Sequence, residues 1–215
     1  MLKNVVGMHI CNIYRDQEER LSISVTYILS GLELKERCVY IADKDIQDAT
    51  LLRLEQAGIR PEKHIESGQL VFLTKDESYL LAGYFSPFRM IDQIEYSHYE
   101  TLKKGYHGLR GAGQMSWALE KSPGSDKLVD YENQVNAIFP NKRMSALCAY
   151  DETKFPEDVL LDVLYTHPKV IIYTTLYDNP HYIPPEIFSK RQRDKYSPGD
   201  YQRIRDSIIN TKMPS

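Results

Sequence analysis

Short apolar runs alternate along the chain with longer segments in which apolar residues recur at helical spacing. The short runs predict strands at residues 8–14, 38–42, 69–74, 108–113, 144–150 and 170–174. The segments between most of them predict helices, as where Val25, Ile28 and Leu32 follow the first run. Because each helix can return the chain to start the next strand alongside the last, we expect an α/β three-layer sandwich with a mostly parallel sheet.

The turn after the first predicted strand argues against nucleotide chemistry. Asp16 can cap the following helix and Glu19 can return the bond, as in a capping box. These carboxylates, with Glu18 between them, would repel a triphosphate where a phosphate-binding protein needs a glycine-rich loop. The chain also lacks the GxxxxGK[ST], GxSxG and HExxH motifs. We therefore expect neither a conventional ATPase nor a conventional hydrolase.

The charge and the length of the chain exclude further classes of protein. The 215 residues include 27 Lys and Arg against 30 Asp and Glu, which disfavours binding to nucleic acid through phosphate contacts. No apolar run approaches the roughly 18 residues of a membrane span, so we expect a cytoplasmic protein with neither direct nucleic-acid nor membrane contacts. Residues 1–188 are predicted to form one domain. Residues 189–215 are predicted to form a basic, solvated helical appendage or subunit clasp, which would allow a homo-oligomer.

A ligand site is expected beyond the carboxyl ends of the parallel strands, where such folds form a crevice. The residues predicted to contact the ligand are Tyr14, Arg110, Met115, Trp117 and Tyr150. Arg110 could bind a carboxylate, or it could form a structural ion pair, for example with Glu132. Met115 and Trp117 suit an apolar or methylated ligand, although core packing would also explain them.

The aromatic insertion after residue 74 has two interpretations. Tyr79, Tyr84, Phe85 and Phe88 do not recur at helical spacing. Exposed aromatic rings on a loop can cover a ligand site or form a contact between subunits. The sequence leaves both open.

A metal site is a third possibility. His9 and Cys11 lie two residues apart on the first predicted strand and should face the same side. Cys38 would join them if the first two strands were neighbours. A zinc site needs about four ligands, however, and no further Cys or His lies close by in the sequence, so burial in the core is the competing interpretation. We therefore expect no metal and no cofactor beyond an unidentified small-molecule ligand.

Several segments together resemble a known family. They include HIC at 9–11, RGAGQMSWAL at 110–119, YE at 131–132, CAYD at 148–151, THP at 166–168 and NPHYIPP at 179–185. Over about residues 5–188 the sequence resembles the MEDS family, the methanogen/methylotroph DcmR-like sensory domain. The resemblance implies a RecA/KaiC-like fold without its phosphate loop and a module that senses small hydrocarbon derivatives.

The same resemblance implies how such a module signals. Members of the family often carry a helix-turn-helix or histidine kinase domain, and these 215 residues leave room for neither. We therefore expect a non-enzymatic sensor of small apolar or methylated compounds that acts in signalling or transcriptional regulation through a protein partner. The alternatives are a degenerate RecA-like nucleotide-binding enzyme, a methyl-transfer accessory protein, and a redox or metal sensor that uses His9 and Cys11.

Overall fold

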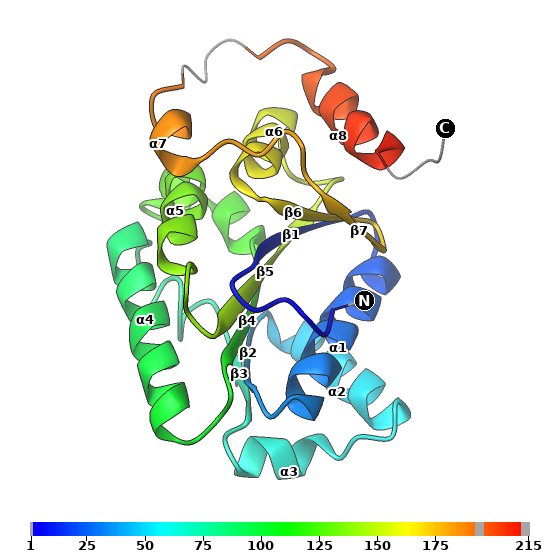
Figure 1. The fold of residues 1–215 in the computed structure, drawn as a ribbon, viewed down its shortest axis with the longest axis vertical. Coiled ribbons are helices and arrows are strands. Elements are labelled where there is room, and N and C mark those ends of the chain that lie inside the picture. The colour runs from blue at the N-terminus through cyan, green and yellow to red at the C-terminus, as the bar shows by residue number, and fades with distance from the viewer. Residues whose placement is uncertain (1, 192–195, 212–215) are drawn as a thin grey trace.

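The computed structural model describes residues 2–191 and 196–211 and contains one seven-stranded sheet, drawn in Figure 1. The strand order is β3-β2-β4-β5-β1-β6-β7, and every pairing is parallel except that of β6 with β7. The strands are β1 (His9–Tyr14), β2 (Arg37–Ile41), β3 (Leu70–Leu73), β4 (Leu109–Gln114), β5 (Met144–Asp151), β6 (Lys169–Ile172) and β7 (Thr175–Asp178). The predicted α/β class and mostly parallel sheet are confirmed. The antiparallel β7 was not predicted.

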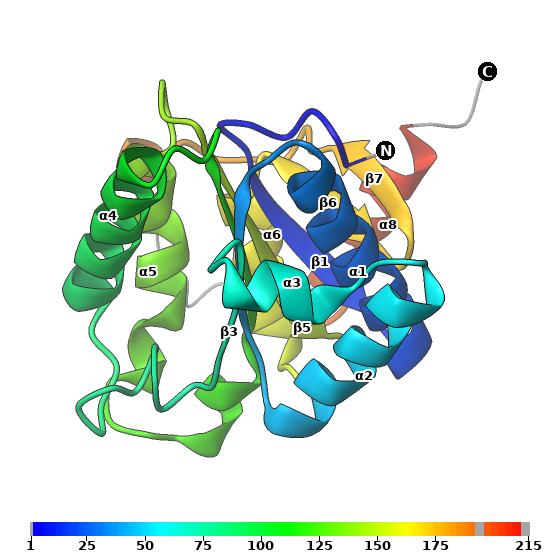
Figure 2. The same cartoon turned by 90° about the horizontal axis from the view of Figure 1, so that it is seen from below.

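Helices cover both faces of the sheet (Figure 2). The α-helices are α1 (Gln17–Glu33), α2 (Lys44–Gln56), α3 (Pro61–Glu66), α4 (Pro87–Lys103), α5 (Leu128–Val135), α6 (Glu157–Thr166), α7 (Pro185–Phe188) and α8 (Asp200–Asn210). Three short 3₁₀ helices are η1 (Ser116–Glu120), η2 (Ser125–Lys127) and η3 (Asn136–Ile138). Helices α1 and α2 bury their apolar residues on one face, and α4, α5 and α6 bury theirs on the other. The three layers follow from these two separate cores.

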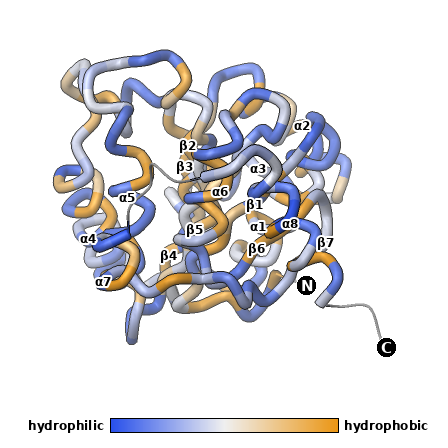
Figure 3. Tube along the Cα trace, turned by 90° about the horizontal axis from the view of Figure 1, so that it is seen from above, coloured by the Kyte–Doolittle hydropathy of each residue, from blue (hydrophilic) through white to orange (hydrophobic). Residues whose placement is uncertain are grey.

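Because side chains alternate between the two faces along each strand, the same strands contribute residues to both cores. On β4, Ala112 faces α1, whereas Gly111 and Gly113 face the α4 side, because successive side chains of a strand point to opposite faces. Figure 3 shows hydrophobic colouring on the central strands and hydrophilic colouring over much of the outer turns and helices. We call the two sides of the sheet the α1 face and the α4 face.

The first strand and helix are joined very tightly. Only Arg15 and Asp16 separate β1 from α1. The backbone N–H of Glu19 donates to Asp16 Oδ1 at 2.9 Å, so the predicted cap is present. The Glu19 carboxylate does not return to Asp16; it accepts from the backbone N–H and the guanidinium of Arg15. This helix N-terminus is therefore occupied by side chains of the chain itself.

The segment after residue 188 differs from the predicted solvated appendage. One face of α8 is buried in the core of the α4 face through Tyr201, Ile204 and Ile208, because the helix carries apolar residues three and four positions apart. Beyond the end of β5, Glu152 accepts hydrogen bonds from Tyr201 and Arg205 of α8. The predicted appendage also includes residues 192–195 and 212–215, which lie outside the described residues.

Candidate functional site

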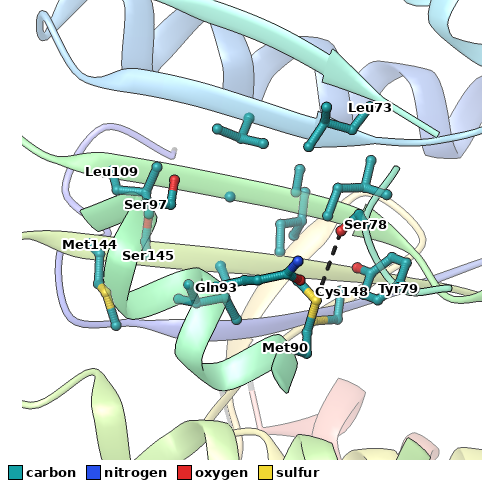
Figure 4. A pocket seen from close by; sticks show the side chains of 18 of the residues that line it. Leu73, Ser78, Tyr79, Met90, Gln93, Ser97, Leu109, Met144, Ser145 and Cys148 are labelled. Atoms are coloured by element: carbon teal, nitrogen blue, oxygen red, sulfur yellow. Dashed lines mark hydrogen bonds between the residues drawn. The ribbon is translucent and has the colours of Figure 1, made fainter. Parts of the chain in front are cut away.

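A cavity of about 220 Å³ lies between α4 and strands β2, β3, β4 and β5 (Figure 4). Most of its wall is carbon and sulfur, contributed by Val39, Ile41, Leu73, Met90, Ile94, Leu109 and Met144. Ser78, Gln93 and Ser97 place a few polar atoms among them. An apolar cavity of roughly 150 Å³ is large enough to bind benzene or xenon. This cavity can therefore hold a small organic molecule.

Small residues on the strands leave this space open. A Cβ built on Gly111 would meet only the carbonyl oxygen of Ser145, at an ordinary contact distance of 3.7 Å. A Cβ on Gly113 would lie 1.9 Å from the Tyr79 hydroxyl, so that glycine lets Tyr79 lie against β4. Gly111 therefore leaves room for a ligand, whereas Gly113 leaves room for a side chain of the cavity wall.

Two tyrosine hydroxyls stand out in the wall. Tyr79 and Tyr131 both line the cavity, and neither hydroxyl has a hydrogen-bond partner within residues 2–191 and 196–211. The Tyr79 ring is held in place by Trp117, whose ring centroid lies 5.0 Å away in a stacked arrangement. Burial raises the pKa of both tyrosines, so both hydroxyls stay protonated and can donate. The residues that line the cavity thus include two possible donors in apolar surroundings.

A buried polar group lies directly behind the wall at Cys148. The Cys148 thiol lines the cavity and lies 3.4 Å from His9 Nε2. Glu132 Oε2 lies 3.1 Å from that nitrogen and 3.4 Å from His167 Nε2. We call His9, Glu132, Cys148 and His167 the histidine–carboxylate group; each is at most 3% exposed.

Burial is the largest single influence on the electrostatics of this group. It opposes the ionisation of Glu132, yet the close contacts with His167 and His9 hold the pKa of the carboxyl well below its usual range. Burial, reinforced by His167, lowers the pKa of His9. Burial and the nearby carboxylate raise the pKa of the Cys148 thiol. Without a bound cation, Glu132 is therefore the anionic centre and Cys148 keeps its proton.

The sheet separates the five residues predicted to contact a ligand. Tyr14 and Arg110 lie on the α1 face, where the guanidinium carbon of Arg20 in α1 is 5.7 Å from the Tyr14 ring. Arg110 Nε donates to Glu36 at 2.6 Å, and Arg110 Nη1 donates to the Tyr27 carbonyl. The predicted structural ion pair is thus present with a different partner. The suggested partner Glu132 was wrong, because it lies on the α4 face.

The other three predicted residues lie on the α4 face, behind the cavity wall. Trp117 packs in the core with its ring 4.4 Å from that of Phe85. Met115 is fully buried, and the Tyr150 hydroxyl donates to Glu132. The structure therefore does not bring the five residues together at one surface. Tyr150 touches the histidine–carboxylate group, and Trp117 stacks on Tyr79, which lines the cavity.

The thiol beside His9 also differs from the prediction. Cys148 is the thiol in contact with His9, and Cys11 lies opposite Cys148 in the pairing of β1 with β5, outside the group. Cys38 cannot join, because β4 and β5 lie between β2 and β1. Its side chain instead packs on the α1 face.

Glu132 and His167 were missed as partners of His9. Besides Cys11, no Cys or His lies near His9 in the sequence, whereas α5 and the residue after α6 supply its partners. The available signal was the resemblance itself, whose segments YE, CAYD and THP contain three members of the group. The insertion residues Tyr79 and Phe85 are buried, and Phe88 is 78% exposed.

No helix within residues 2–191 and 196–211 is both long and apolar enough to span a membrane. The fold is similar to the solved structure of the KaiC-like protein PH0186 from Pyrococcus horikoshii OT3, with a TM-score of 0.53 and 13% identity. That match covers 78% of this chain and 71% of the archaeal chain. It supports the KaiC-like fold alone.

Sequence comparison identifies the family. The transcriptional repressor DcmR of Methylorubrum extorquens (strain DSM 6343 / CIP 106787 / DM4) is 28% identical over 168 residues, which are 77% of this chain and 60% of the repressor. The family model "MEthanogen/methylotroph, DcmR Sensory domain" matches residues 8–168. Because that match spans most of the sequence and includes the whole histidine–carboxylate group, this chain belongs to the MEDS family of sensory domains.

Proposed function

We propose that this chain senses a small, mostly apolar molecule that binds in the cavity between α4 and the sheet, and that it reports the bound state to a regulatory partner. The observation that carries the proposal is the apolar cavity of about 220 Å³, with two tyrosine hydroxyls that have no hydrogen-bond partner in the described part of the chain. Membership of a sensory-domain family supports it.

The wall suggests the chemistry of the ligand. Burial of carbon against Met90, Ile94 and Leu109 would supply most of the affinity, at roughly 25 cal/mol per Å² of apolar surface. The hydroxyls of Tyr79 and Tyr131 would each donate to an oxygen or halogen of the ligand. Small alcohols, ketones and haloalkanes combine these features, and they agree with the family's expected hydrocarbon derivatives.

The regulatory role is proposed from the similarity to DcmR. DcmR is a transcriptional repressor, and this chain matches 60% of its length, so we propose a part in transcriptional control in the cytoplasm rather than the repressor's whole activity. Binding would shift an existing equilibrium only if the ligand contacts one state better than the other. Helix α4 is the element whose contacts with the ligand would differ most directly between the two states, because it forms one wall of the cavity.

Filling the cavity tests the proposal. Variants Gly111→Ala, Gly111→Val and Gly111→Leu place increasing volume where only the Ser145 carbonyl lies nearby. Calorimetry with benzene, xenon and a series of C1–C6 alcohols and haloalkanes should show affinity that falls along the series, by about tenfold or more at leucine. Equal affinity in wild type and Gly111→Leu, or no binding of any probe to wild type, would contradict the proposal.

Removing one hydroxyl tests the proposed hydrogen bond to the ligand. Tyr131→Phe should weaken binding of an alcohol about 2–10-fold, as expected for one lost hydrogen bond, and leave benzene unaffected. The matched control is Tyr99→Phe, which removes a hydroxyl from an exposed position of α4. An equal loss in both variants would show that the Tyr131 hydroxyl does not contact the alcohol.

A further inference from the structure

Four side chains able to bind a metal meet at one point in the core. His9 comes from β1, Glu132 from α5, Cys148 from β5 and His167 from the residue after α6. One ligand atom from each lies within 4.8 Å of the other three. In a tetrahedral zinc site, bonds of roughly 2.0–2.3 Å place the ligand atoms roughly 3.3–3.8 Å apart. The contacts of 3.1, 3.4 and 3.4 Å within the group are close to that spacing.

The Nδ1 atom of each histidine already forms a hydrogen bond. His9 Nδ1 lies 3.1 Å from Asn136 Oδ1, and the amide nitrogen of Asn136 donates to the Thr166 carbonyl, which fixes the orientation of that amide. His167 Nδ1 lies 2.8 Å from the Val163 carbonyl. Both Nδ1 atoms therefore carry a proton and donate. In the neutral imidazoles, both Nε2 atoms then present a lone pair.

These two nitrogens converge on one carboxyl group. Both Nε2 atoms approach the same oxygen, Glu132 Oε2. Within the described residues, Glu132 Oε2 and His167 Nε2 have no hydrogen-bond partner, although both are fully buried. Such atoms normally find a partner, because leaving a buried polar atom unsatisfied is costly.

A bound cation would give the unsatisfied Glu132 Oε2 and His167 Nε2 a common partner. A divalent cation accepts both nitrogen lone pairs, the carboxylate and the Cys148 thiolate, and its charge equals that of the two anionic ligands. The thiol proton leaves to solvent as the bond from sulfur to the metal forms.

We propose that His9, Glu132, Cys148 and His167 bind one divalent ion of the zinc class. Two imidazole nitrogens, a carboxylate and a thiolate form a donor set of intermediate softness that suits zinc in tetrahedral geometry. Asn136, Val163 and Tyr150 orient three of the four ligands, as the outer shell of a metal site does.

The proposal goes beyond the sensing of a small molecule and does not depend on it. Cys148 lines the cavity, which therefore supplies a route by which the ion reaches the buried group. Four protein ligands leave no open coordination position, so the ion would organise the core where β1, β5, α5 and α6 meet.

Metal analysis tests the site directly. The full chain is purified without a histidine tag or chelator, its metal content is measured by plasma mass spectrometry, and the stripped protein is titrated with Co²⁺. We expect one ion per chain and a thiolate-to-cobalt charge-transfer band. Cys148→Ser should abolish that band and weaken Co²⁺ binding about tenfold or more. Cys11→Ser is the matched control, since Cys11 lies opposite Cys148 and outside the group.

A second variant decides the result if Cys148→Ser does not fold. The chain has three cysteines, so Cys11→Ser combined with Cys38→Ser leaves Cys148 as the only thiol. The charge-transfer band in that protein would support the site, and its absence would overturn it. Failure of the wild type to bind Co²⁺ stoichiometrically, or equal affinity in Cys148→Ser, would also overturn the proposal and leave a buried ion pair.

Discussion

Two charged groups are buried on opposite faces of the sheet, and they differ in how completely their polar atoms are paired. On the α1 face, Arg110 donates to Glu36 and to the carbonyls of Leu2, Lys3 and Tyr27. On the α4 face, Glu132 Oε2 and His167 Nε2 lie close together without hydrogen-bond partners in the described chain. The comparison separates a group that is paired within the fold from one that keeps two buried polar atoms unpaired in the described chain.

The surroundings of the two groups differ in the same way. Around Arg110, a Cβ on the neighbouring Gly31 would collide with side chains, so the α1 face has no spare volume at that point. Beside Cys148, the α4 face keeps a cavity of about 220 Å³. Close packing on one face thus coexists with retained space on the other.

The largest expected effect is the loss of the Arg110 ion pair. Arg110→Leu should lower the free energy of unfolding by about 3–5 kcal/mol, because it leaves the Glu36 carboxylate buried without its partner. Urea denaturation measures this loss. Arg53→Leu is the control, since its ion pair with Glu18 is exposed and should contribute about 1 kcal/mol or less. A loss near the control value for Arg110→Leu would contradict the structural role.

A smaller effect should follow from adding one methyl group to each face. Gly31→Ala places a Cβ 2.6 Å from Cys38 Sγ and 2.7 Å from Arg110 Cδ, which should cost about 1–3 kcal/mol of stability. Gly111→Ala enters the cavity and should be neutral or stabilising by up to about 1 kcal/mol. Thermal and urea unfolding of the two variants measure the contrast. Equal losses would mean that the two faces are equally packed.

The smallest expected effect is that of nucleotides. ATP and GTP with Mg²⁺ should leave the melting temperature unchanged, because the turn from β1 to α1 presents Asp16 and Glu19 where a triphosphate needs free N–H groups. A ligand that binds the folded state would raise the melting temperature with concentration. A saturable rise that is lost in Arg15→Ala would instead favour the nucleotide-binding alternative.

The sequence carried enough information for the fold. Alternating apolar runs located β1 to β6 and the large helices, since the periods of strands and helices differ. The short α3 and the antiparallel β7 were missed, because PEKHIE and TLYD contain few apolar residues, whereas the equally short β3 and β6 are almost wholly apolar. For α8, the charged residues hid an apolar face that only the packing against α6 and β7 makes visible.

The site was less predictable because it depends on which strands become neighbours. The order β4-β5-β1-β6 brings Cys148 beside His9 and separates Cys38 from both. The face that a strand residue occupies changes with each position, so Arg110 and Gly111 point to opposite sides. Local spacing shows that neighbouring positions face opposite sides, but it does not show which side each one faces or which strands become neighbours. These two facts divided the predicted contact residues between two faces.

Cys148 belongs to the cavity wall and to the histidine–carboxylate group at once. If both proposed sites are occupied, their binding equilibria are thermodynamically linked. A small molecule that moves the Cys148 sulfur would change the affinity for the ion by some factor, and the ion would change the affinity for that molecule by the same factor. The domain would then respond to the concentrations of two different chemical species, and its output would depend on their combination.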